Sequence, residues 1–139
     1  MWTAEGHLLV ARGYDAATKE HVRTSAKRVF VHIDARNPHG SAYVVDVEDD
    51  GRGRTVAFQK RGDVVVAAEF DDKESELATL DLLQMYLYAL ETILGGLDAR
   101  RVLRDTTMAR DVLDEIIVGG ITVETDVNAV LQRVRENQR

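Results

Sequence analysis

The sequence contains no cysteine and a single proline among its 139 residues. Without cysteine the chain has no disulfide bonds, no thiolate zinc sites and no cysteine nucleophiles. One proline and ten glycines leave no low-complexity linker, and the length fits one domain, which we expect to span residues 1–139. The hydrophobic fraction of 45% and the charged fraction of 30% are typical of a soluble globular protein.

Long apolar runs and an excess of basic residues are also missing. No uninterrupted apolar run approaches the roughly 18–20 residues that cross a bilayer, and the first residues lack the basic start and apolar core of a secretory signal. The net charge is −6, from 18 basic and 24 acidic residues, whereas nucleic-acid binding needs a cationic surface. We therefore expect a cytoplasmic protein that binds no nucleic acid and reaches membranes only peripherally or through a partner.

The first half of the chain predicts a short strand, a helix and a three-stranded meander. Leu8–Val10 follows a glycine and has the apolar character of a short strand, and Asp15 is a candidate cap for a helix over residues 16–31. Three β-rich or alternating segments follow, separated by short polar turns that contain glycine. These strands are expected at residues 41–47, 55–59 and 64–70.

A long helix is predicted over residues 77–94, since this stretch has no glycine or proline and ends at Gly95-Gly96. On a helical wheel its apolar positions cover an arc of roughly 220°, where a helix with one solvated face shows a stripe of a little over about 100°. These positions are Leu82, Leu83, Met85, Tyr86, Leu87, Ala89, Leu90, Ile93 and Leu94. One side should face the sheet, and the other must be covered by later helices of this chain or by another protein.

Two more helices are predicted beyond the long one. The first spans residues 105–118, with an apolar face and a stop at Gly119-Gly120. A short extended piece at residues 121–124 precedes a last helix over 127–134. Because strands and helices segregate along the chain, the fold class is expected to be α+β, an antiparallel sheet with helices packed on it.

Residue types that serve metal binding and catalysis are present, but not at the spacings that the chemistry needs. The four histidines are 14, 11 and 7 positions apart, which excludes the paired histidines of a zinc helix. The acidic segment that starts at Asp46 resembles a calcium loop, yet its twelfth position is Ala57, which has no carboxylate. The acidic residues over 71–76 suit a helix start better than an acid–base pair. We expect no enzyme, no metal and no cofactor.

A specific pattern connects the last two predicted helices. Residues 112–126 are Val-Leu-Asp-Glu-Ile-Ile-Val-Gly-Gly-Ile-Thr-Val-Glu-Thr-Asp, and Glu76-Leu77 opens the long helix upstream. Together these segments resemble the small subunits of vesicle coats, the coatomer zeta and clathrin-adaptor sigma subunits. The Gly-Gly pair and the Glu-Thr-Asp triplet make the likeness closer to coatomer zeta than to sigma.

This resemblance implies a longin-like (SNARE-like) fold, an antiparallel sheet of four to five strands with helices packed on both faces. The family has a full strand before its first glycine turn, whereas only Met1–Gly6 precede Leu8 here. Either that strand is very short, or the start is truncated, or the sheet edge is open. The resemblance also implies a non-catalytic subunit that binds the helical solenoid of a larger coat subunit and lies peripheral to transport-vesicle or Golgi-type membranes.

The wide apolar arc of the long helix supplies candidates for that partner interface. They are Leu82, Met85, Tyr86, Ala89 and Ile93. If they face the partner, Tyr86→Asp should weaken its capture while the isolated fold survives. If later helices of this chain cover the arc, the same pattern results, and the sequence leaves both interpretations open. Asp114 and Glu115 likewise either orient the helix end or form a salt link to the partner.

Two other classes of protein remain open. A longin-type regulator that pairs with itself or with another longin and engages a small GTPase predicts a dimer. A small-molecule-binding or catalytic α+β domain predicts a closed polar pocket with perturbed titrating groups. Neither class has a sequence motif in this chain.

Overall fold

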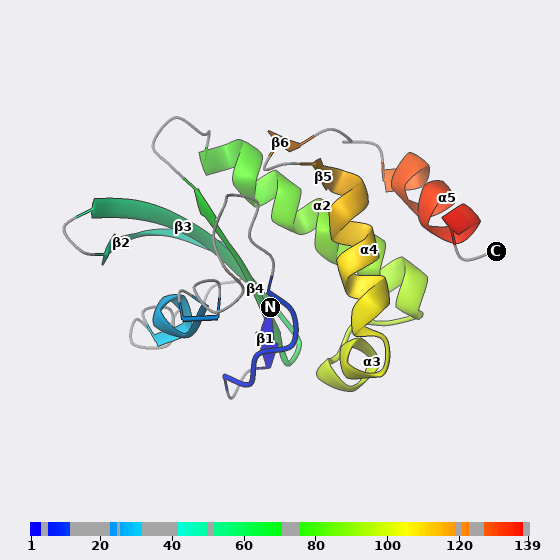
Figure 1. Cartoon of the computed structure of the whole chain (residues 1–139), viewed down its shortest axis with the longest axis horizontal. Helices are drawn as coiled ribbons and strands as arrows, with labels where there is room; N and C mark the ends of the chain where they lie inside the picture. Colours follow the sequence, from blue (N-terminus) through cyan, green and yellow to red (C-terminus); the bar gives the residue numbers. More distant parts are fainter. Residues whose placement is uncertain are drawn as a thin grey trace.

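A computed structural model shows how the chain is arranged (Figure 1). It describes residues 1–3, 6–11, 23–24, 26–31, 42–49, 52–70, 76–118, 121–122 and 127–137. The elements in chain order are β1 (Trp2–Thr3), β2 (Ala42–Asp49), β3 (Arg52–Arg61), β4 (Val64–Phe70), α2 (Glu76–Leu94), α3 (Ala99–Arg104), α4 (Thr106–Ile116), β5 (Ile117–Val118), β6 (Ile121–Thr122) and α5 (Val127–Asn137). Residues 23–24 and 26–31 are also helical, within the helix predicted over 16–31.

The main sheet is antiparallel, with its strands in the order β1-β4-β3-β2. β2 and β3 pair along their length, from Ala42 opposite Gln59 to Asp49 opposite Arg52. A tight turn joins β3 to β4, and in it Gly62 has a φ of +60°, a conformation that favours glycine. The predicted meander is confirmed, with β2 and β3 longer than the sequence pattern indicated.

The edge of the sheet next to β4 is reduced compared with a longin-like sheet of four to five strands. β1 contributes only two residues, with Trp2 opposite Val65 and Thr3 opposite Val64. Leu8 forms an isolated bridge to Trp2, so the strand predicted at Leu8–Val10 is not formed. In the described ranges the sheet therefore has three long strands and one very short one.

The first ten residues double back at this edge. Gly6 has a φ of +96°, and a β-carbon there would lie 2.7 Å from Phe30 Cε1, so the reversal requires glycine. The Met1 amine donates a 2.8 Å hydrogen bond to the Val10 carbonyl, and the Leu9 N–H donates to the Met1 carbonyl at 2.9 Å. Burial lowers the pKa of the Met1 amine from 8.0 to about 5, because the charged form loses its solvation.

Alternating side chains of β3 and β4 build an apolar layer on each side of the sheet. One layer joins the helical residues 26–31 to the sheet, and its buried members are Trp2, Val29, Val56, Phe58 and Val65. The other layer joins α2 to the sheet through Ala57, Val64 and Val66. Figure 1 shows the two helices on opposite sides of the sheet, which confirms the expectation of helices on both faces.

α2 is the longest of the described helices, and it lies at the centre of the apolar layer that includes Ala57, Val64 and Val66. It ends where predicted, since Gly95 has a φ of +75° and the Gly96 N–H donates a 2.9 Å hydrogen bond back to the Glu91 carbonyl. By length and a hydropathy of 1.2, α2 would be able to cross a membrane. It instead packs on β3 and β4, so we interpret it as the core helix of the fold.

The segment after α2 differs from the single helix predicted over residues 105–118. Two helices meet at Asp105 instead, and each follows an aspartate cap. The Asp98 carboxylate accepts the Arg101 N–H at 2.8 Å, which lowers the pKa of Asp98, and Asp105 accepts the Met108 N–H at 3.0 Å. α4 stops at Ile116 rather than 118, because β5 leaves the helix to pair with β6.

The buried Met1 amine gives the chain a defined dependence of stability on pH. The unfolded chain binds a proton between about pH 5 and pH 8 that the folded chain releases, so the free energy of unfolding should rise with pH across this window. A shift of this size contributes at most about 4 kcal/mol. Urea unfolding between pH 5 and pH 8 measures the slope. The matched control is the chain acetylated at Met1, whose slope should be smaller; equal slopes would contradict the assignment to the amine.

Candidate partner-binding surface

α2 lies between the sheet and a second layer that is made by α4 and α5 (Figure 1). Its buried side chains are Thr79, Leu83, Tyr86, Leu87, Ala89 and Leu90. All of them except Thr79 belong to one apolar core that also holds Val102 of α3, Val112 of α4 and Val130 of α5. Later helices of this chain therefore cover much of the wide apolar arc.

Two of the five predicted interface residues are inside this core. Tyr86 is 2% exposed, and its hydroxyl donates a 2.9 Å hydrogen bond to the Ala109 carbonyl of α4. Ala89 is fully buried. Because both side chains are buried within this chain, neither is accessible to another protein. Tyr86→Asp would place a carboxylate in the core, so we now expect this change to destabilise the isolated fold.

The other three predicted residues are at the margin of the core. Leu82, Met85 and Ile93 are half-buried and pack against the core cluster. Each keeps part of its side chain accessible, so these three remain candidates for contact with a partner.

The side of α2 that this chain leaves open is a stripe of exposed residues at helical spacing. We call it the outer stripe, and its members are Leu77, Asp81, Gln84, Tyr88 and Glu91. Leu77 is 69% exposed and Tyr88 is 56% exposed. Eleven positions separate them, which puts them on one side of the helix about 16 Å apart. Glu91 is already engaged, since its carboxylate accepts a 3.0 Å hydrogen bond from Arg61.

Leu77 and Tyr88 were not among the residues that the sequence proposed for the interface. The spacing of the polar residues in the sequence could have identified these two positions as exposed. Asp81, Gln84 and Glu91 mark the solvent side of α2, and two large apolar side chains interrupt that polar side. A large apolar residue on the polar side of a helix indicates a partner contact better than one on the apolar arc does. Residues on the arc are usually buried by other elements of the same chain.

Glu115, the second member of the Asp-Glu pair at the end of α4, joins two helices of the same chain. One Glu115 carboxylate oxygen accepts a 2.8 Å hydrogen bond from Arg133 Nε, and the other accepts a 3.1 Å bond from Asn137 Nδ2. Both donors belong to α5, so Glu115 fixes α5 against α4. The structure thus supports the interpretation that the pair orients the helix end, and Glu115 is occupied within the chain.

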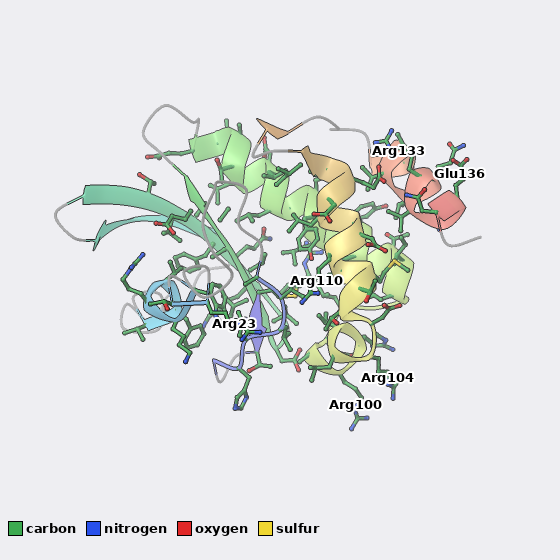
Figure 2. All side chains as sticks on the ribbon, in the orientation of Figure 1. Arg23, Arg100, Arg104, Arg110, Arg133 and Glu136 are labelled. Atoms are coloured by element: carbon green, nitrogen blue, oxygen red, sulfur yellow. The ribbon has the colours of Figure 1, made fainter. Side chains whose placement is uncertain are left out.

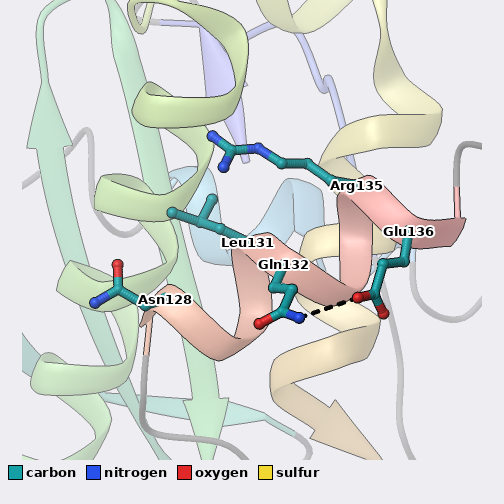
Figure 3. Close-up of a pocket in the computed structure, with 5 residues that line it drawn as sticks. All are labelled: Asn128, Leu131, Gln132, Arg135 and Glu136. Carbon is teal, nitrogen blue, oxygen red and sulfur yellow. Dashed lines mark hydrogen bonds between the residues drawn. The ribbon is translucent and has the colours of Figure 1, made fainter.

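An open depression of about 480 Å³ runs along α5 (Figure 3). Its lining residues are Asn128, Leu131, Gln132, Arg135 and Glu136. Gln132 Nε2 donates a 3.0 Å hydrogen bond to Glu136 Oε1 across one side of it. The only acidic group in this lining is therefore bonded to an amide, and no cluster of three metal-ligating side chains occurs in the described part of the chain. Such a lining offers hydrogen bonds to a ligand rather than an acid–base pair.

Comparison with known proteins decides the family. The family described as the clathrin adaptor complex small chain matches residues 1–139. The chain belongs to the clathrin adaptor small-chain family. The AP-3 complex subunit sigma of Eremothecium gossypii is 38% identical over 69 residues, which cover 50% of this small chain and 37% of that subunit. The aligned segment is thus much shorter than that fungal relative.

Two other relatives align with nearly the whole small chain. The AP-3 complex subunit sigma of Arabidopsis thaliana is 26% identical over 98% of this chain and 82% of its own length. The human AP-1 complex subunit sigma-1A is 19% identical over 98% of this chain and 83% of its own. Among structures, a chain of a homology model of the full-length AP-3 complex in a stretched open conformation has a TM-score of 0.73. It shares 21% of residues, and the match covers 99% of this chain and 89% of that one, which supports the fold.

These comparisons correct one expectation from the sequence. The relatives named above are sigma subunits, so the preference for coatomer zeta is not supported. That preference came from the Gly-Gly pair and the Glu-Thr-Asp triplet, which lie at residues 119–120 and 124–126, outside the described residues. A helix stop followed by a helix cap favours such residues in any chain with this connection, so they distinguish poorly between subfamilies.

The Tyr86 hydroxyl should contribute to stability through its hydrogen bond to α4. We expect Tyr86→Phe to lower the free energy of unfolding by about 0.5–1.5 kcal/mol, because it removes a buried hydrogen bond to the Ala109 carbonyl. Chemical denaturation followed by circular dichroism measures this. The matched control is Tyr88→Phe at an exposed site of the same helix, which should change stability by less than about 0.5 kcal/mol. Equal effects at the two positions would contradict the role given to the buried bond.

Proposed function

We propose that this small chain is the non-catalytic sigma-type subunit of an adaptor complex of the AP-3 kind, acting in vesicle-mediated protein transport. The family match over the whole chain is the observation that carries the proposal. Support for the AP-3 kind comes from the fungal and plant relatives, which are named as AP-3 sigma subunits. In this role the chain works on the cytoplasmic side of transport-vesicle or Golgi-type membranes, and it reaches them through the complex.

The partner in this proposal is the helical solenoid of a larger subunit of the complex. Leu77 and Tyr88 of the outer stripe are large apolar side chains that the chain leaves in water, and Leu82, Met85 and Ile93 are only half-buried. A helix of the partner that lies along the outer stripe would cover Leu77 and Tyr88. Permanent interfaces bury on the order of 2,000 Å² or more and are rather apolar, which suits this side of the molecule.

Isolation of the complex from the source cells tests the function. A tagged small chain should recover a stoichiometric larger subunit with helical repeats, identified by mass spectrometry, together with other adaptor subunits. A dimer of twice the 15.5 kDa chain mass, joined by a small GTPase, would instead favour a longin-type regulator. Recovery of the chain alone as a monomer would contradict both assignments.

Paired substitutions on α2 test the surface. We expect Leu77→Asp/Tyr88→Asp to weaken capture of the larger subunit by at least about tenfold, because apolar anchors dominate protein interfaces. The isolated chain should stay folded, since both side chains are exposed. The matched control is Val31→Asp, an equally exposed apolar residue of the helix on the opposite side of the sheet. Undiminished capture by the folded double variant would remove the outer stripe from the interface.

A further inference from the structure

The short helix α3 presents two arginines and a leucine on one exposed side. Arg100, Leu103 and Arg104 are separated by three and four positions, so they share one side of the helix. Leu103 is 61% exposed, and both arginines are exposed. Figure 2 shows Arg100 and Arg104 pointing away from the body of the molecule at the end where α3 lies. We call these three residues the α3 tip.

The arginines of the α3 tip are not held in ion pairs, whereas three other arginines are. Arg101 bonds to Asp98, Arg61 to Glu91 and Arg133 to Glu115. Within the part of the chain that the structure describes, Arg100 and Arg104 form no ion pair or hydrogen bond, although the Asp98 carboxylate attracts Arg100 electrostatically. Two positive side chains that are not bonded to a carboxylate therefore flank one exposed apolar side chain.

The α3 tip is held in place by the rest of the fold. Asp98 caps the start of α3, and the Ala99 N–H donates a 3.0 Å hydrogen bond to Asp63 in the turn between β3 and β4. Val102, on the opposite side of α3, is fully buried in the core. A ligand of this surface would thus contact arginines on a helix that is already fixed by the fold. Binding would therefore lose less conformational entropy than binding to a mobile segment.

We propose that the α3 tip is a contact for an anionic lipid membrane. Arginines next to an exposed leucine match a surface that carries negative headgroups above an apolar interior. The tip projects at one end of the molecule (Figure 1), so it can approach a flat surface, whereas the described depression runs along α5. The chain as a whole has a charge of −6, but charges beyond about 8 Å are screened at physiological ionic strength, so the local sign decides the contact.

The contact should be weak for a single chain and gain strength in an assembly. Each basic residue near an anionic surface strengthens binding about fivefold, so two arginines and one leucine give a reversible contact. Several chains on one membrane would add their contacts through effective concentration. This inference goes beyond the proposed function, because it concerns the chain alone and holds with or without the larger subunit.

Vesicle flotation with the full chain at physiological ionic strength tests the proposal. We expect binding to phosphatidylserine-rich vesicles, little binding to phosphatidylcholine vesicles, and loss of binding as salt is raised. Arg100→Gln/Arg104→Gln should lower the partition coefficient by about 25-fold, from about fivefold per arginine. Leu103→Ser should also lower it, because the apolar contact is removed. The matched control is Arg135→Gln on α5, the same change at another exposed arginine, and it should bind as the unchanged chain does.

Several outcomes would overturn the proposal. They are no flotation of the unchanged chain at physiological ionic strength, equal binding to both lipids, and equal loss in the Arg135→Gln control. Binding to a soluble polyglutamate peptide that depends on Arg100 and Arg104, with no flotation, would assign the tip to an acidic protein partner instead. Circular dichroism of each variant confirms folding. Since no partner subunit is present in this experiment, its failure leaves the result of the complex isolation unaffected.

Discussion

The fold depends on the burial of α2 between two layers. Leu87 and Leu90 in the middle of the helix are fully covered, and the surrounding core draws on β3 and β4 from one side and on α3, α4 and α5 from the other. A sheet of three long strands and a two-residue strand has little apolar area of its own to bury. One helix that is apolar on two sides lets this small sheet share a core with the C-terminal helices.

The remaining side of α2 connects the fold to the proposed function. Two sides are satisfied within the chain, and the third carries Leu77 and Tyr88 in water. A small chain that belongs to an adaptor family and exposes apolar side chains along its central helix is suited to a permanent partner rather than to a free existence. The α3 tip lies on another helix, so contact with a partner at α2 and contact with a membrane at α3 use different residues.

The sequence predicted the parts of the fold that local patterns control. Alternation gave the meander, and the Gly95-Gly96 stop gave the end of α2. The helix α3 was missed, because it is short and half of its residues are arginine; the burial of Val102 and the packing of Ala99 against the core show that it belongs there. The predicted interface included Tyr86 and Ala89, which are buried within the chain, for a related reason. Periodicity tells which side of a helix is apolar, but the tertiary arrangement decides which element covers it.

The pairing of β1 with β4 has a consequence for the order of folding. Trp2 lies opposite Val65, so the first strand finds its neighbour only across more than sixty intervening residues. Long-range closure of this kind is slow compared with local hairpins, whereas β3 and β4 are joined by one tight turn. The meander can therefore assemble first as a template. β1 then docks on β4 and completes the edge of the sheet after the meander has formed.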